Sequence, residues 1–207
     1  MSDTPRLILA SGSAIRARVL KDAGLAFEQI PSAVDEAILK QGIETTGPHD
    51  PVHGAGPAIA TALAEAKARD VAAAHPDALV IGADQVMTLA TDCFDKPRDM
   101  AQARARLAAF RGRTHTLHAG IALAAGGETL WQHYEAAHLT MRAFSDAFLD
   151  AYLAAAGEGV LASVGAYQLE SLGSQLFARI DGDYFSILGL PLLPLMEELR
   201  RRGALTA

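Results

Sequence analysis

One short apolar run constrains this 207-residue chain more than any other segment. Residues 80–89 (VIGADQVMTL) are largely apolar and include β-branched residues, a pattern that predicts a buried strand. An acid, Asp84, and an amide, Gln85, nevertheless lie in the middle of the run. A buried carboxylate needs a partner, a metal or a proton. Asp84 is therefore either half of a structural salt bridge or part of a functional site.

Lys96, followed by Pro97, comes shortly after the turn expected at residues 90–92. An acid inside a strand and a lysine beyond its end can frame an anionic substrate. Asp84 and Gln85 are adjacent, so they point to opposite faces of an ideal strand. Both can serve one cleft only if the strand bends or bulges at residues 82–84.

The N-terminal part of the chain predicts a strand at residues 7–10, a turn, and a helix over about 14–23 with Ser13 as its N-cap. Arg16 then falls in the first helical turn. A cation is poorly placed there because the helix dipole is already positive. A bound phosphate would remove this conflict; the alternative is an ordinary strand–helix junction with a solvated arginine.

A second strand is expected over residues 25–34, ending in the acid pair Asp35-Glu36. Such a pair can bind a divalent metal through its oxygens, or simply begin a polar loop. Residues 45–57 are rich in Gly, Pro and His and read as a loop. The helix that follows, to about residue 75, carries Lys67, which is either solvated or able to reach into a cleft past its alanine neighbours.

The remaining chain predicts a helix capped by Asp99, with Arg104 and Arg106 on its wet face, then a β-hairpin, and helices capped by Ser145 and begun by Pro191. The hairpin strands, 114–124 and 129–142, carry four histidines. His115 and His118 are three residues apart and point to opposite faces, so they cannot share a zinc ion.

Composition narrows the possible functions. A net charge of -6 argues against a nucleic-acid partner held by a basic surface. A single cysteine, Cys93, fits a reducing compartment. No apolar run reaches ~18 residues and the N-terminus lacks a signal-peptide pattern. We expect one domain over residues 1–207 in a cytoplasmic protein with no membrane partner.

Several ordered motifs point to one family. In chain order they are Leu9-Ala10-Ser11-Gly12-Ser13 followed by Arg16, Val34-Asp35-Glu36, Ala66-Lys67-Ala68, Gly82-Ala83-Asp84-Gln85-Val86, Lys96-Pro97, Gly112-Arg113-Thr114-His115, Gly165-Ala166-Tyr167 and Gly189-Leu190-Pro191-Leu192. Together they resemble the Maf family of nucleoside triphosphate pyrophosphatases over nearly the whole chain. Agreement among many motifs in order is far more specific than any one of them.

The resemblance implies an α/β fold related to inosine triphosphate pyrophosphatase, an elongated mixed sheet flanked by helices, with two lobes around a cleft. It also implies metal-dependent hydrolysis between the α- and β-phosphates, with Mg²⁺ or Mn²⁺, and suggests a homodimer. By the family pattern Asp84 is the proton acceptor, and whether it is a base or chiefly a metal ligand stays open. Glu36 matches a metal-site acid, and phosphate-contacting positions match Ser11, Arg16, Lys67 and Lys96.

Three positions bear on which base is accepted: Ile15, Gln85 and Glu170. Gln85 and Glu170 look like the branch associated with 7-methyl-GTP. A carboxylate at Glu170 can accept the N1–H and N2–H₂ donors of guanine, and its charge favours a cationic 7-methylguanine. Ile15 departs from the aromatic residue often found in that branch. The alternatives are dTTP/UTP hydrolysis and a catalytically idle nucleotide-binding regulator of septum formation.

Overall fold

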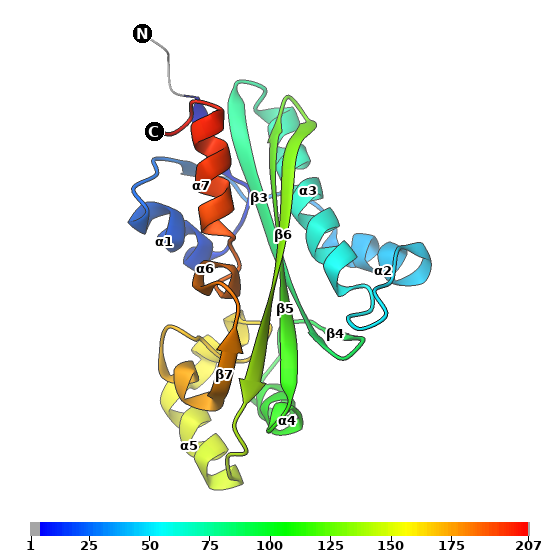
Figure 1. Cartoon of the computed structure of the whole chain (residues 1–207), viewed down its shortest axis with the longest axis vertical. Coiled ribbons are helices and arrows are strands. Elements are labelled where there is room, and N and C mark those ends of the chain that lie inside the picture. Colours follow the sequence, from blue (N-terminus) through cyan, green and yellow to red (C-terminus); the bar gives the residue numbers. More distant parts are fainter. Residues whose placement is uncertain (1–4, 207) are drawn as a thin grey trace.

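The computed structural model describes residues 5–206 and has an elongated shape (Figure 1). Its strands are β1 (Arg6–Leu9), β2 (Glu28–Gln29), β3 (Ala78–Leu89), β4 (Asp92–Phe94), β5 (Thr114–Ala125), β6 (Glu128–Met141) and β7 (Phe177–Asp181). Its helices are α1 (Ala14–Asp22), α2 (Glu36–Thr46), α3 (Gly56–Ala74), α4 (Met100–Phe110), α5 (Asp146–Ala156), α6 (Tyr184–Ile187) and α7 (Leu192–Arg201). Two short 3-10 helices, η1 (Gly157–Ala162) and η2 (Leu172–Leu176), complete the chain.

The strands form one mixed sheet in the order β2-β1-β3-β5-β6-β7, with β4 added beside β3. Strand β1 is parallel to β2 and β3, whereas the other pairs are antiparallel. The predicted mixed α/β class is therefore confirmed. The long strands β3, β5 and β6 run through the molecule and connect its two ends (Figure 1).

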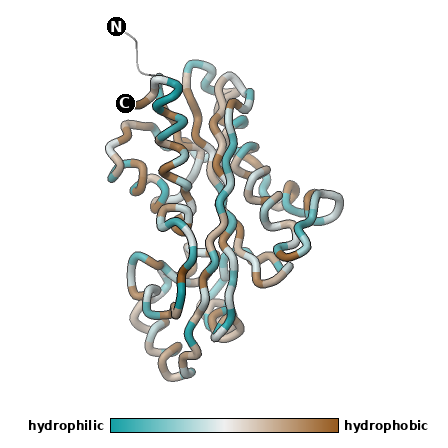
Figure 2. The backbone as a smooth tube through the Cα atoms, viewed as in Figure 1, coloured by the Kyte–Doolittle hydropathy of each residue, from teal (hydrophilic) through white to brown (hydrophobic). Residues whose placement is uncertain are grey.

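Each end of the long strands has its own hydrophobic core. At one end α1 and α7 cover one face of the sheet and α3 covers the other (Figure 1). At the other end Phe110, Leu139 and Leu149 pack with their neighbours around α4 and α5. Hydrophobic residues recur along the central strands, while α7 alternates hydrophilic and hydrophobic positions, as expected for a helix covering a sheet (Figure 2).

Helix α3 packs unusually close to the sheet because two glycines face it. A Cβ on Gly82 would lie 2.1 Å from the carbonyl oxygen of Ala64, and one on Gly120 would lie 2.3 Å from that of Ala60. Only hydrogen atoms fit in these spaces. The close approach lets Lys67, on the same helix as Ala64, reach the middle of β3.

The structure leaves part of one β3 edge without a strand neighbour. Strand β1 pairs with residues 78–81 and β4 pairs with residues 87–89 of the same edge. Between them, residues 82–86 have no neighbouring strand on this edge within the described chain. The middle of β3 is therefore open along this edge of the sheet.

Several sequence-based expectations need correction. The strand expected over residues 25–34 is wrong in length: β2 has only two residues, because only Glu28 and Gln29 pair with β1. Helix α2 was not expected; Asp35 is its N-cap and accepts hydrogen bonds from Ala37 N and Ile38 N, both at 3.1 Å. Strand β4 was also missed, directly after the expected turn. The other predicted helices, the hairpin and the caps Ser13, Asp99 and Ser145 are confirmed.

Candidate functional site

A cleft of about 860 Å³ opens at the gap in the sheet. All of the residues singled out in the sequence for a site role line it: Ser11, Ile15, Arg16, Glu36, Lys67, Asp84, Gln85, Lys96 and Glu170. They come from segments spread over most of the chain. The structure therefore brings together every member of the predicted set.

Asp84 and Gln85 both line this cleft although β3 has no bulge at residues 82–84, so the bulge offered as one condition for this is absent. Strand β3 pairs with β5 in unbroken register from Val80 to Thr88. The two side chains do point to opposite faces: Asp84 toward α3, and Gln85 toward α6. Both contribute to one cleft because it wraps around the open edge of β3.

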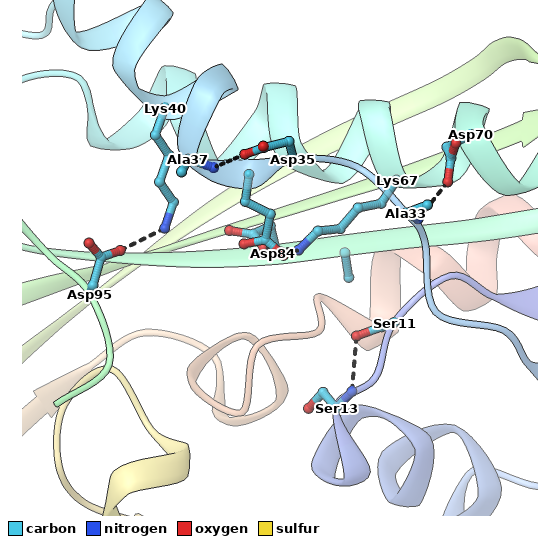
Figure 3. Close-up of polar contacts among 12 residues, drawn as sticks. Ser11, Ser13, Ala33, Asp35, Ala37, Lys40, Lys67, Asp70, Asp84 and Asp95 are labelled. Carbon is cyan, nitrogen blue, oxygen red and sulfur yellow. Dashed lines mark hydrogen bonds and ion pairs between the residues drawn. The ribbon is translucent and has the colours of Figure 1, made fainter. Parts of the chain in front are cut away.

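A buried lysine holds the two acids of the site together. Lys67 and Asp84 are 7% and 6% exposed. The Nζ atom of Lys67 lies 2.6 Å from Asp84 Oδ1 and 2.7 Å from Glu36 Oε1 (the Asp84 pair is drawn in Figure 3). Burial acts to raise the pKa of Glu36, but Lys67 outweighs it through hydrogen bonding and charge, so that the pKa is lowered. The solvated alternative for Lys67 is excluded.

Arg16 fixes the start of α1 against two other segments. Its Nε donates to Gly189 O at 2.8 Å, and its Nη1 donates to Ala83 O at 2.9 Å and to Ser11 Oγ at 3.1 Å. Burial lowers the pKa of Arg16, against the opposing attraction of Asp84 and Glu36. The guanidinium thus stands at the helix N-terminus beside both acids, held mainly by neutral acceptors.

Helix α2 adds a cation that the sequence reading missed. Lys40 lies one helical turn after Glu36 and lines the cleft, and its Nζ is 2.7 Å from Asp95 Oδ1 (Figure 3). Burial acts to lower the pKa of Lys40, but Asp95 outweighs it, so the pKa is raised. The signal was present: Asp35 is a helix N-cap residue, and a helix starting there places Glu36 and Lys40 on one face. Lys96, next to Asp95, is exposed at the cleft mouth.

Residues 162–164 and 167–170 line the same cleft as Ile15 and Gln85. Gln85 Nε2 donates to Ser186 O and Ile187 O, both at 3.0 Å, which fixes the orientation of the amide. A Glu170 carboxylate oxygen lies 3.7 Å from Arg18 Nη2, and its side chain is largely buried. The cleft lining therefore includes an amide and a carboxylate as well as the lysines of α2 and α3.

The histidines lie where the sequence placed them. His115 is buried near Phe110 and Tyr167, and its Nε2 is 2.7 Å from Tyr167 Oη. His118 faces the other side of the sheet, between Thr88 and Tyr134. Burial lowers the pKa of each imidazole to about 4. Within residues 5–206 there is no group of three or more His, Cys, Asp or Glu side chains placed to hold a metal ion.

One arginine is not where the sequence placed it. Arg104 is exposed and pairs with Asp150, as expected for a wet helix face. Arg106 is 9% exposed and bonds to the backbone of Asp95 and Val164. Its burial is decided by loops that pack on α4 from elsewhere in the chain.

The donor set fits a hard divalent cation. Glu36 and Asp84 converge on one Nζ, and each carboxylate has a second oxygen with no protein donor among the described residues. Mg²⁺ is typically held by one or two carboxylates together with substrate phosphates. Two convergent carboxylates in a cleft that is also lined by Arg16, Lys40 and Lys96 match that requirement.

The fold and cleft define a mixed α/β protein with one cleft lined by both acidic and basic side chains. A family model described as Maf-like protein matches residues 6–202, so this chain belongs to that family. A relative from Rhizobium meliloti (strain 1021), named 7-methyl-GTP pyrophosphatase, is 52% identical over 204 residues, covering 98% of this chain and 99% of the relative. A relative from Maricaulis maris (strain MCS10), named nucleoside triphosphate pyrophosphatase, is 51% identical over 200 residues, covering 97% and 98%.

A crystal structure of a nucleoside-triphosphatase / dITP/XTP pyrophosphatase from Mycobacterium abscessus covers 96% of this chain and 94% of its own, with 13% identity and a TM-score of 0.38. A TM-score this low does not establish a shared fold. In residues 5–206 there is no helix whose length and hydropathy would suit a membrane span.

Proposed function

We propose that this chain hydrolyses nucleoside triphosphates between the α- and β-phosphates, releasing a nucleoside monophosphate and pyrophosphate. One observation carries the proposal: Lys67 pairs with both Asp84 and Glu36 in a cleft that further basic side chains also line. The names of the relatives, pyrophosphatases of nucleoside triphosphates, support the same activity.

The proposed chemistry follows from charge and position. Transfer at phosphorus needs positioning and charge neutralisation more than covalent help. The amides at the start of α1 and Arg16 bind part of the triphosphate, and Lys40, Lys67 and Lys96 bind the rest. Asp84 accepts the proton of a water that attacks the α-phosphorus. The bond from the α-phosphorus to the bridging oxygen breaks, and pyrophosphate leaves with that oxygen.

We further propose that Asp84 and Glu36 hold Mg²⁺ or Mn²⁺ when substrate binds. The cleft lining contains four basic residues (Arg16, Lys40, Lys67, Lys96) and four acidic ones (Glu36, Asp84, Asp95, Glu170), so the protein alone does not offset a triphosphate. A divalent cation would supply the missing positive charge. Lys67 keeps the two carboxylates together while the cation is absent.

The base preference we propose is for 7-methyl-GTP or another modified or purine nucleotide. Glu170 offers two acceptor oxygens, which suit the paired N–H donors of guanine better than the single N3–H of a pyrimidine. The fixed amide of Gln85 lies in the same cleft. We also expect a homodimer in the cytoplasm, as the sequence resemblance and the single cysteine suggest.

A substrate panel with and without Mg²⁺ or Mn²⁺ tests the proposal. Monophosphate and pyrophosphate are expected as products, with 7-methyl-GTP and purine nucleotides preferred over UTP and dTTP, and with activity lost in EDTA. Release of inorganic phosphate as the sole phosphate product would contradict cleavage at the α–β bond.

The Asp84→Asn variant tests the assigned residue. Its turnover should fall by about 10²–10⁴-fold, the usual contribution of a general base, while nucleotide binding is retained. Binding is measured by calorimetry with a nucleotide whose α–β bridge resists hydrolysis. Unchanged turnover would remove Asp84 from the mechanism.

A further inference from the structure

Arg106 is a buried cation that touches both walls of the cleft from behind. It projects from α4 and is 9% exposed, among the buried residues Ala103, Leu107 and Phe110 of the same helix. Its Nη1 donates to Val164 O at 2.6 Å and to Asp95 O, one bond for each of its hydrogens. One side chain therefore joins two segments that are far apart in sequence.

The two segments carry opposite parts of the candidate site. Asp95 precedes Lys96 and pairs with Lys40, so its backbone sets the position of the lysine-bearing wall. Val164 belongs to the segment of residues 162–170 that contains Glu170 and lines the other wall. The two bonds of Arg106 fix the distance between a wall suited to phosphates and a wall suited to a base.

Apolar packing alone does not explain an arginine at this position. Burial lowers the pKa of Arg106. The groups that accept its hydrogen bonds are backbone carbonyls. The carboxylate of Asp95 is 81% exposed and pairs with Lys40 instead. A methionine at position 106 could still contact the Phe94 ring, which lies 5.4 Å from the guanidinium carbon. It would leave the carbonyls of Asp95 and Val164 without their donor, so only a side chain that donates can join the two segments.

We propose that Arg106 is a positioning residue that sets the width of the cleft, and so couples recognition of the base to recognition of the phosphates. This inference rests on the proposed pyrophosphatase function. Arg106 touches neither Asp84 nor Lys67, so its loss should loosen substrate binding and base discrimination more than the chemical step.

The test compares Arg106→Met with Arg104→Met, a matched control on the same helix whose guanidinium bonds to Asp150 on the surface. A shift of about 1 Å in a site can cost about 100-fold, so we expect KM for the preferred nucleotide to rise by about 10–100-fold in Arg106→Met. The kcat should change by less than about 3-fold, and the kcat/KM ratio of 7-methyl-GTP to UTP should fall by about 10-fold. Arg106→Lys, which keeps a donor, should recover part of both losses, and Arg104→Met should change neither.

Hydrogen–deuterium exchange gives a readout that needs no substrate. Exchange should rise in the segments around Asp95 and Val164 in Arg106→Met, and stay unchanged there in Arg104→Met. If Arg106→Met does not fold, Arg106→Gln, which retains one amide donor, takes its place. A folded Arg106 variant could instead keep the wild-type KM, the wild-type kcat/KM ratio of 7-methyl-GTP to UTP, and wild-type hydrogen–deuterium exchange. That result would overturn the positioning role and leave the proposed function intact. A wild-type protein that hydrolyses no nucleotide would overturn both.

Discussion

Replacement of Lys67 by methionine is the most direct test of how the site is held together. The substitution keeps most of the apolar stem, in a side chain one atom shorter, and removes the charge. Asp84, 6% exposed and 2.6 Å from Nζ, then becomes a buried carboxylate without its partner. At a separation of about 2.7 Å and an effective dielectric constant of about 20, the gross attraction is roughly 6 kcal/mol before desolvation is subtracted. Removal of one member of a buried ion pair typically costs about 3–5 kcal/mol, which is the loss of unfolding free energy we expect.

The matched control is Lys40→Met. It also removes one lysine from the cleft lining, but Lys40 pairs with an Asp95 carboxylate that is 81% exposed, and such pairs contribute only about 0–1 kcal/mol. Urea unfolding at pH 7.5, followed by circular dichroism, measures both values. The double variant Lys67→Met, Asp84→Asn should recover much of the loss, because the buried Asp84 charge is gone and the Glu36 carboxylate, which also loses Lys67, is 45% exposed to solvent. The reasoning fails if Lys67→Met costs no more than Lys40→Met, or if Asp84→Asn does not rescue it.

Three further predictions concern packing, pH and specificity. Gly82→Ala should lower the free energy of unfolding by at least about 1–3 kcal/mol and reduce turnover, because the added Cβ forces α3, and with it Lys67, away from β3. The control Gly42→Ala lies in α2, where a Cβ meets nothing within 4 Å, and should be neutral or slightly stabilising in the same urea assay. Burial lowers the pKa of His115 from its ordinary 6.5 to about 4, so the unfolded state takes up this proton at a higher pH than the folded state does. The free energy of unfolding should therefore fall as pH drops from about 6.5 to about 4, and should fall less steeply with pH in His115→Phe. An equal dependence on pH in the two proteins would contradict this. Glu170→Gln should shift the kcat/KM ratio from guanine toward pyrimidine nucleotides by about 10-fold, and an unchanged ranking would refute the role assigned to that carboxylate.

The sequence by itself determined the local features of this protein. Ser13, Asp99 and Ser145 cap helices because their side chains accept backbone N–H groups a few residues ahead, an interaction that needs no distant partner. The long hairpin and the buried strand through Asp84 followed from residue pattern and turn composition in the same way. The nine site residues were found because their motifs occur in a known order, not because their positions in space could be read from the chain.

Tertiary structure decided which side chains meet. Helix α2 was missed because none of its residues is buried, so its apolar pattern was too weak to separate it from a loop. Without that helix, Lys40 could not be assigned to the cleft. Arg106 was placed on the wet face because polarity predicts exposure, whereas two carbonyls from remote loops bury it.

The cleft itself depends on pairings between distant strands. Strands β1 and β4 bind the same edge of β3 and leave residues 82–86 open between them. That opening lets Asp84 and Gln85, on opposite faces of a strand without a bulge, serve one cleft. Strand alternation is a local rule and correctly placed the two side chains on opposite faces. Only the order of strands in the sheet could show that both faces lead to the same site.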